Sequence, residues 1–125
     1  MLIFPWRTLA EVIPSASYVA LLGVVRISGI RLLPSFLRFG FQIEPQLRRT
    51  PGVVGYRTAA QPTRLCWYHL SVWIDSAAIR QFVGTAPHVT AMVHYGDRLG
   101  ETVFRYWAVT GADLPLHFRR ELHRL

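Results

Sequence analysis

The chain has 125 residues, of which 51% are apolar and only 17% are charged, so it suits one domain and is too apolar for an intrinsically disordered chain. All 14 basic residues are arginine, and the net charge of +7 permits binding to nucleic acid, anionic lipid or anionic metabolites, although scattered surface arginines are the simpler interpretation. The single cysteine, Cys66, excludes an intrachain disulfide and a cysteine zinc cage, and it fits a reducing compartment.

The uncharged run Val12 to Val25 has fourteen residues and contains Pro14. A membrane-spanning helix needs about 20 apolar residues, so the sequence predicts no membrane span. Glu11 and the prolines also argue against a signal peptide. We therefore expect a cytoplasmic protein.

Residues 1–17 show no clear period and are expected to form an arm that packs on the domain or on a second subunit. The domain, residues 18–125, begins with a β-branched strand over 18–28. A helix is predicted over 33–49, where Leu37 and Phe41 keep helical spacing and Pro45 is expected to kink or break it. A second strand is predicted over 52–60.

The strongest strand signal covers residues 64–74, which are rich in aromatic and branched side chains. Asp75 or Ser76 can cap the next helix, which pauses at 84–87, resumes over 88–95 and ends at Gly96. A fourth strand over 101–111 and an amphipathic helix over 114–125 follow. The order β-α-β-β-α-β predicts an α+β, ferredoxin-like fold with a four-stranded antiparallel sheet and a C-terminal helix.

The two faces of the third predicted strand differ in character, because successive side chains of a strand point to opposite faces. One face is a conventional core of Cys66, Tyr68, Leu70 and Val72. The other face, which we call the mixed face, carries Trp67, His69, Ser71 and Trp73. It is too apolar for water and too polar for a plain core, so we expect an identical copy of the chain to cover it and enclose a pocket.

Several short segments together resemble the dimeric α/β-barrel superfamily, which includes the antibiotic-biosynthesis monooxygenase-like domains. The segments are Pro51-Gly52, the strand over 67–73, Asp75-Ser76, Phe82, His88 and Met92. Ser71-Val72-Trp73 with Phe82 and Pro87-His88 is similar to spheroidene monooxygenase-like sequences. The ending Trp107 to Gly111 with Leu114-Pro115 resembles an uncharacterised family of the same superfamily, and the resemblance covers residues 18–120.

This resemblance implies a homodimer in which two sheets close a barrel over internal pockets. It also implies a monooxygenase-like small-molecule enzyme that acts on an apolar or aromatic metabolite between sheet and helices. Members include oxygenases without metal or flavin, haem-binding enzymes and proteins without known activity, so the family does not select a reaction. We expect no cofactor, with haem as the alternative.

Two histidines are the candidate catalytic residues. His69 lies between two tryptophans on the mixed face and could be a general base, or it could be hydrogen-bonded across a dimer interface. In haem-using relatives a histidine after the third strand is the axial ligand, and His88 occupies a similar region, so it is the metal ligand if haem is bound. The alternative for His88 is a structural residue at the start of a helical segment.

The remaining candidate residues would bind substrate. Trp67, Trp73 and Trp107 could form a pocket wall or simply pack in the core, and Ser71 adds a hydroxyl. Arg57 and Arg105 could hold an anionic group, or each could form a surface ion pair. No pair of histidines has zinc spacing, and no phosphate loop is present. A nucleic-acid binder is disfavoured, and a non-catalytic ligand-binding dimer stays open.

Overall fold

The structure is a computed structural model that describes the backbone of residues 1–125 and every side chain except that of Asp97. The strands are β1 (Leu2–Ile3), β2 (Arg7–Thr8), β3 (Ser17–Ile27), β4 (Val53–Gln61), β5 (Cys66–Trp73) and β6 (Leu99–Thr110). The α-helices are α1 (Leu33–Arg49), α2 (Ser76–Val83), α3 (His88–Tyr95) and α4 (Phe118–Glu121). Short 3-10 turns η1 (Ile30–Leu32), η2 (Pro62–Arg64), η3 (Gly96–Arg98), η4 (Gly111–Asp113) and η5 (Leu122–Arg124) join them.

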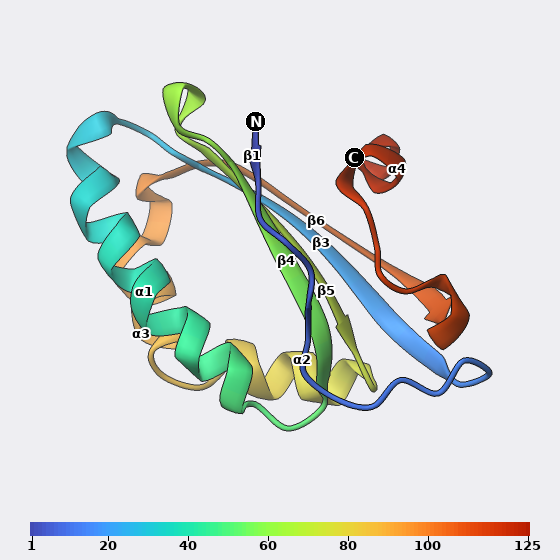
Figure 1. Ribbon diagram of the computed structural model, residues 1–125. Coiled ribbons are helices and arrows are strands. Elements are labelled where there is room, and N and C mark those ends of the chain that lie inside the picture. The colour runs from blue at the N-terminus through green and yellow to red at the C-terminus, as the bar shows by residue number, and fades with distance from the viewer.

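The four long strands form an antiparallel sheet in the order β4-β5-β3-β6, and the short strands β1 and β2 both pair with β4. Helices α1, α2 and α3 lie on one side of this sheet, and the C-terminal segment with α4 lies on the other side (Figure 1). This arrangement confirms the predicted ferredoxin-like α+β fold. The N-terminal arm lies on the domain's own edge strand, β4.

Local signals in the sequence place most element boundaries correctly. Asp75 caps α2, because its Oδ1 accepts a hydrogen bond from the backbone N–H of Ala78 at 2.9 Å. The expected break at Pro45 is wrong, since α1 continues through it. Beyond the proline, Leu47 is buried, and the Gln46 side chain donates to the carbonyls of Phe82 in α2 and of Thr85 after it, so packing holds the last turn in place.

The predicted C-terminal helix over 114–125 is largely wrong. Only the four residues of α4 are α-helical, and His117 is extended, with φ −127° and ψ 132°. Leu116 and Phe118 are both buried, at 1% and 2% exposed, against the sheet. Two residues that are two apart reach the same surface only when the backbone between them is extended, so burial overrides the helical spacing.

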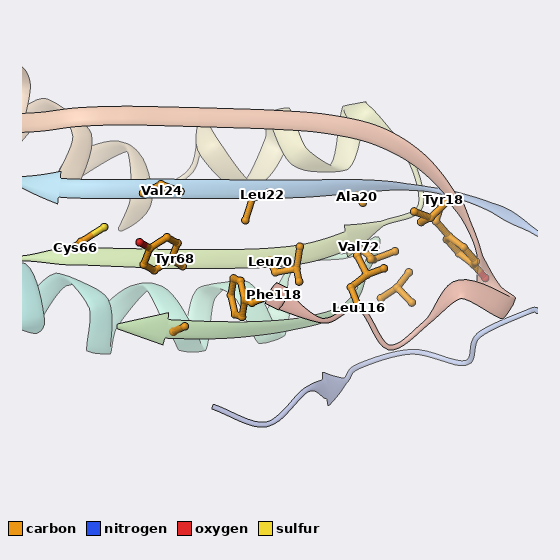
Figure 2. Close-up of a cluster of buried hydrophobic side chains, with 13 residues drawn as sticks. Tyr18, Ala20, Leu22, Val24, Cys66, Tyr68, Leu70, Val72, Leu116 and Phe118 are labelled. Atoms are coloured by element: carbon orange, nitrogen blue, oxygen red, sulfur yellow. The ribbon is translucent and has the colours of Figure 1, made fainter. Parts of the chain in front are cut away.

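The sheet separates two hydrophobic cores. One lies on the face that carries Cys66, Tyr68, Leu70 and Val72 of β5, where Leu116 and Phe118 of the C-terminal segment cover the strands (Figure 2). The other lies under the helices and joins residues of β3, β4 and β5 to α1 and α2: Leu21, Leu47, Val53, Tyr56, Trp73, Ala78, Ile79 and Phe82.

Our expectation that an identical copy covers the mixed face is therefore wrong. Trp73 on this face packs at 5.5 Å, between ring centroids, on Phe82 of α2, and Trp67 packs at 4.5 Å on Phe36 of α1. The alternation of side chains shows which residues share a face, but it does not show which face the helices cover. The helices of this chain cover the mixed face.

Candidate functional site

His69 lies near the middle of β5, between Gly23 of β3 and Thr58 of β4. The imidazole is partly buried beneath the helices, and the ring of Tyr56 stacks beside it with centroids 6.5 Å apart and planes 18° apart. The sheet register therefore presents a histidine toward the helices, with an aromatic ring on one side. That His69 lines a pocket stays a prediction of the sequence.

Burial sets the protonation state of His69. Desolvation, together with the charge of nearby His88, lowers the pKa of His69 to about 4. The imidazole is therefore neutral at pH 7, and it can accept or donate one hydrogen bond at each nitrogen according to its tautomer. A histidine with this pKa is a weak base unless a bound anion stabilises its protonated form.

His88 is the first residue of α3, and the helix start holds it in place. Its backbone N–H donates to Oε1 of Gln46 at 2.9 Å, and its Nδ1 lies 3.3 Å from the carbonyl oxygen of Val83. The ring packs on Phe82 with centroids 5.0 Å apart. Burial lowers the pKa of His88, against a smaller opposing effect of the Val83 carbonyl. The structure thus brings both predicted histidines to the same side of the sheet.

A tyrosine–carboxylate pair that sequence reasoning missed lies next to His69. The Tyr56 hydroxyl donates to Oε1 of Glu44 in α1 at 2.8 Å. Burial, with the hydrogen bond and charge of Glu44 adding to it, raises the pKa of Tyr56 to about 12. The sequence contained one clue, since Glu44 lies three residues before buried Leu47 and therefore near the inward side of α1. The pair fixes the Tyr56 ring beside the imidazole.

Three other predicted residues of the mixed face line the same region at different depths. Ser71 and Trp73 are fully buried, and the indole Nε1 of Trp73 donates to the Ser71 hydroxyl at 2.8 Å. Trp67 is only partly buried, under Phe36 of α1. Ser71 and Trp73 therefore form the packed end of the region, and Trp67 keeps surface that a ligand could contact.

Gly23 is a further residue of this site that we did not single out from the sequence. A Cβ atom at this position would lie 3.0 Å from the ring of Phe104 and 4.0 Å from Cβ of His69. Phe104, on the neighbouring strand β6, therefore lies over the glycine while its side chain is 48% exposed. A glycine in a strand interior is a signal for a close approach, and here the Phe104 ring approaches the backbone beside His69.

The last three predicted residues lie on the opposite face of the sheet. Arg57 donates from Nε to the Phe4 carbonyl at 3.2 Å and from Nη1 to the Leu116 carbonyl at 3.3 Å, so it joins the two chain termini. Arg105 donates to the Arg124 carbonyl at 3.1 Å, and the Arg124 guanidinium lies 4.2 Å above the Trp107 ring. The structure thus separates Arg57, Arg105 and Trp107 from His69.

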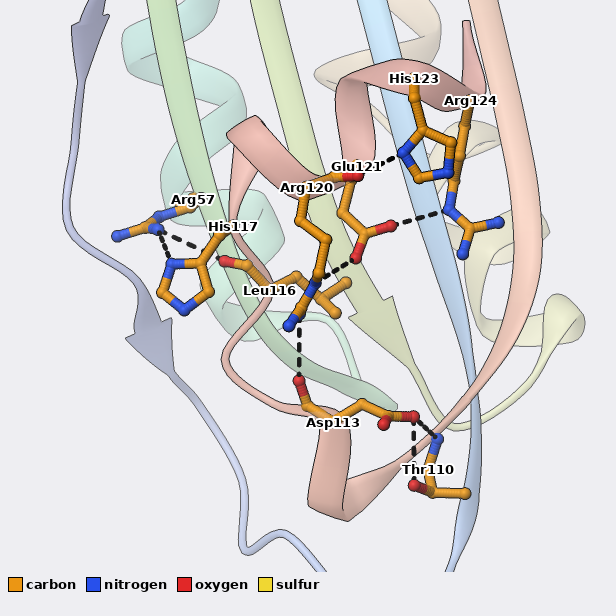
Figure 3. Close-up of polar contacts among 9 residues, drawn as sticks. All are labelled: Arg57, Thr110, Asp113, Leu116, His117, Arg120, Glu121, His123 and Arg124. Carbon is orange, nitrogen blue, oxygen red and sulfur yellow. Dashed lines mark hydrogen bonds and ion pairs between the residues drawn. The ribbon is translucent and has the colours of Figure 1, made fainter.

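A buried carboxylate holds the C-terminal segment on this second face. Glu121 is 4% exposed and accepts from Nε of Arg120 at 3.0 Å and from Nε of Arg124 at 2.7 Å (Figure 3). Burial alone would raise the pKa of Glu121, but the two arginines lower it on balance. The second face is therefore closed by the chain's own residues.

Metal ligands are not clustered in the described part of the chain. Among the side chains that the structure describes, no group of three or more histidine, cysteine or acidic residues is placed to hold a metal ion. The described side chains therefore do not support a zinc-type metal site. None of the described helices is both long and apolar enough to cross a membrane.

By sequence alone, the chain matches no family model and no curated protein. By structure, it is similar to an antibiotic biosynthesis monooxygenase with a TM-score of 0.63 and 11% identity, over 71% of this chain and 95% of the other. A protein from Caulobacter crescentus CB15, named as a candidate antibiotic biosynthesis monooxygenase, gives a TM-score of 0.62 at 15% identity over 74% and 89%. A candidate monooxygenase from Fusobacterium nucleatum gives 0.68 at 10% identity, over 82% of this chain and 46% of the other.

These likenesses define the class of fold. The chain has the ferredoxin-like fold that these monooxygenase-like proteins share, and this is the fold that the resemblance of the sequence implies. At identities of 10–15%, the likeness establishes the fold and not the reaction.

Proposed function

We propose that this protein is a monooxygenase-like enzyme that binds an apolar or aromatic metabolite between the sheet and helices α1 to α3. The observation that supports this most is His69, a neutral imidazole set among aromatic rings under the helices. The Phe104 ring, which lies over Gly23, is near it on one side, and Tyr56, fixed by Glu44, flanks it on another. A flat, apolar substrate with one polar group suits such a surface.

In this proposal the neutral His69 accepts the proton of a phenolic or enolic substrate. The resulting carbanion reacts with O2, and a substrate CH2 group becomes a carbonyl while the second oxygen atom leaves as water, so no external reductant is needed. Proton transfer from a group of pKa about 8 to a base of pKa about 4 is uphill by about 5 kcal/mol. The substrate anion must therefore form beside the imidazolium, whose charge stabilises it.

The test is oxygen uptake with a panel of aromatic polyketides and terpenoids, compared between wild type, His69→Ala and His123→Gln. His123 is an exposed histidine outside the proposed site and serves as the matched control. We expect His69→Ala to lower turnover by about 100-fold or more, the usual effect of removing a general base, and His123→Gln to leave it unchanged. Equal turnover of His69→Ala and wild type would remove His69 from the reaction.

A second candidate is a haem protein, and one observation favours it. Nδ1 of His88 lies 3.3 Å from the Val83 carbonyl, which fits a tautomer with the proton on Nδ1 and a free Nε2. In many metal sites a carbonyl that accepts from the other ring nitrogen orients the histidine ligand, so Nε2 of His88 fits an axial ligand to haem iron. Haem would supply the oxygen chemistry, and His88 would hold it.

Haemin titration distinguishes the two candidates. If His88 binds haem, the wild-type protein gives a Soret band that differs from that of free haemin, and His88→Ala shifts or abolishes this band. His94 is an exposed histidine of the same helix, so the control variant His94→Ala retains the band. A spectrum of free haemin with wild-type protein would eliminate the haem candidate and leave the cofactor-free reaction.

A homodimer, which the family resemblance implies, belongs to the same proposal. Residues of the C-terminal segment already cover the sheet face opposite the helices, so a second copy would meet that segment rather than bare strands. Light scattering across a range of concentrations measures the assembly state. A mass of one chain, about 14.3 kDa, at all concentrations would contradict the dimer.

A further inference from the structure

Helix α1 has apolar side chains on two sides, and only one side faces the site. Its inner side places Phe36 on Trp67, Glu44 on Tyr56 and buried Leu47 in the core. Its outer side carries Leu37, 43% exposed, and Phe41, 76% exposed. The sequence predicted that both residues keep helical spacing, and the structure places them on the exposed side of the helix.

The exposed residues form a continuous line along the helix. Pro34, Leu37 and Phe41 are three or four residues apart, and Ile30, 70% exposed, lies in the turn that leads into the helix. Residues at this spacing lie on the same side of a helix. We call Ile30, Pro34, Leu37 and Phe41 the apolar stripe.

The neighbouring helix, α3, also exposes apolar residues. Helix α3 packs beside α1 through Tyr95, whose ring lies 5.7 Å from that of Phe39, and a shallow groove joins Gly40 of α1 to Met92 of α3. Met92 is 38% exposed and Val93 is 79% exposed. Scattered exposed apolar residues are ordinary, but a line of this length with apolar neighbours indicates a binding surface.

The charge around the stripe decides which partner fits it. Residues 26–49 contain five arginines and one acidic residue, Glu44, whose carboxylate is already bound to Tyr56 on the inner side of α1. Arg31 and Arg38 are exposed beside the stripe, and Arg98 is exposed after α3. Exposed phenylalanine and leucine flanked by arginine are typical of helices that lie in the interface of an anionic membrane.

We propose that the outer side of α1 docks onto an anionic lipid surface. Leu37 and Phe41 enter the boundary between headgroups and acyl chains, and Arg31 and Arg38 contact the lipid phosphates. Because the same helix covers His69 from its other side, docking would place the proposed site next to a reservoir of apolar molecules. That consequence rests on the proposed function, whereas lipid binding itself does not.

The test is sedimentation of the full chain with vesicles of phosphatidylglycerol and phosphatidylcholine, and with vesicles of phosphatidylcholine alone. We expect binding to the anionic vesicles that weakens as salt is raised and little binding to the neutral ones. Phe41→Ser lowers the affinity by about tenfold, and Arg38→Gln lowers it by about fivefold. Ile13→Ser, at a residue that is 56% exposed in the arm and whose backbone lies against Gly111, is the matched control and leaves binding unchanged.

Three results would overturn the proposal. The first is that the wild type does not bind anionic vesicles at low salt, and the second is that wild type and Phe41→Ser bind equally. The third is a dimer in solution that Phe41→Ser dissociates, because a second copy of the chain would then occupy the stripe. Oxygen uptake with substrate added in detergent separates this proposal from the proposed function. A Phe41→Ser variant that keeps turnover but loses vesicle binding supports docking, and one that loses turnover but keeps vesicle binding refutes it.

Discussion

Phe118 tests whether the C-terminal segment covers the sheet of its own chain. Its ring is 2% exposed and lies edge-on to Tyr68 of β5, with centroids 6.2 Å apart. Truncation of a fully buried phenylalanine to alanine costs about 3–5 kcal/mol, because it removes apolar burial and leaves a cavity. A domain of this size has a free energy of unfolding of about 5–15 kcal/mol, so Phe118→Ala should remove a large part of it.

Urea unfolding followed by tryptophan fluorescence measures this change. With a slope of about 2 kcal/mol per molar urea, the midpoint should fall by about 2 M. Phe41→Ala is the matched control, because the Phe41 ring is 76% exposed. Its free energy of unfolding should stay within about 0.5 kcal/mol of the wild-type value. A Phe118→Ala midpoint equal to that of Phe41→Ala would show that the segment does not pack on this face.

Three further changes test the helix cap, the buried histidine and the glycine of the site. Asp75→Ala removes the acceptor for the Ala78 N–H and should lower the free energy of unfolding by about 1 kcal/mol, measured by urea unfolding, with Asp75→Asn retaining most of it. The pKa of His69 is lower in the folded state than its ordinary value of 6.5, so the unfolded state binds more protons between pH 6.5 and about 4. The free energy of unfolding should therefore fall as pH drops through this window, by about 3 kcal/mol in total. His69→Gln should make the free energy of unfolding depend less on pH, and a dependence as steep as that of wild type would contradict the lowered pKa of His69. Gly23→Val places a Cβ about 3.0 Å from the Phe104 ring and displaces that ring beside His69, so it should lower oxygen uptake while circular dichroism stays native. Full turnover would show that the reaction does not depend on the position of the Phe104 ring.

The sequence predicted the strands and most helix boundaries because their signals are local. Asp75 and Gly96 mark helix ends by hydrogen-bonding and backbone preferences that need no tertiary context. The region around Phe118 could not be predicted in this way. Its apolar residues also fit a helical period, and only the sheet that they cover forces the extended backbone at His117.

Local signals likewise predicted only part of the candidate site. Strand alternation correctly placed His69 with Trp67, Ser71 and Trp73, but it could not show that helices cover this face. The partners of a side chain on a distant element are set by strand register and helix position, so the contact between Glu44 and Tyr56 was not readable from spacing.

The same limit applies to Arg57 and Trp107, which were grouped with His69 by residue type. Arg57 pairs in register with Leu70, and Trp107 pairs with Ala20, so both point to the opposite face. Their residue types suggested substrate binding. Strand pairing, which only the fold reveals, places them where they contact the terminal segments of the chain.

The most direct test of the account is the titration of His69 by NMR, with its signals assigned by comparison with His69→Gln. This imidazole lies partly buried between sheet and helices, and its titration midpoint should be about pH 4. A midpoint near 6.5, the ordinary value of histidine, would show that the ring is open to solvent and would contradict a site under the helices.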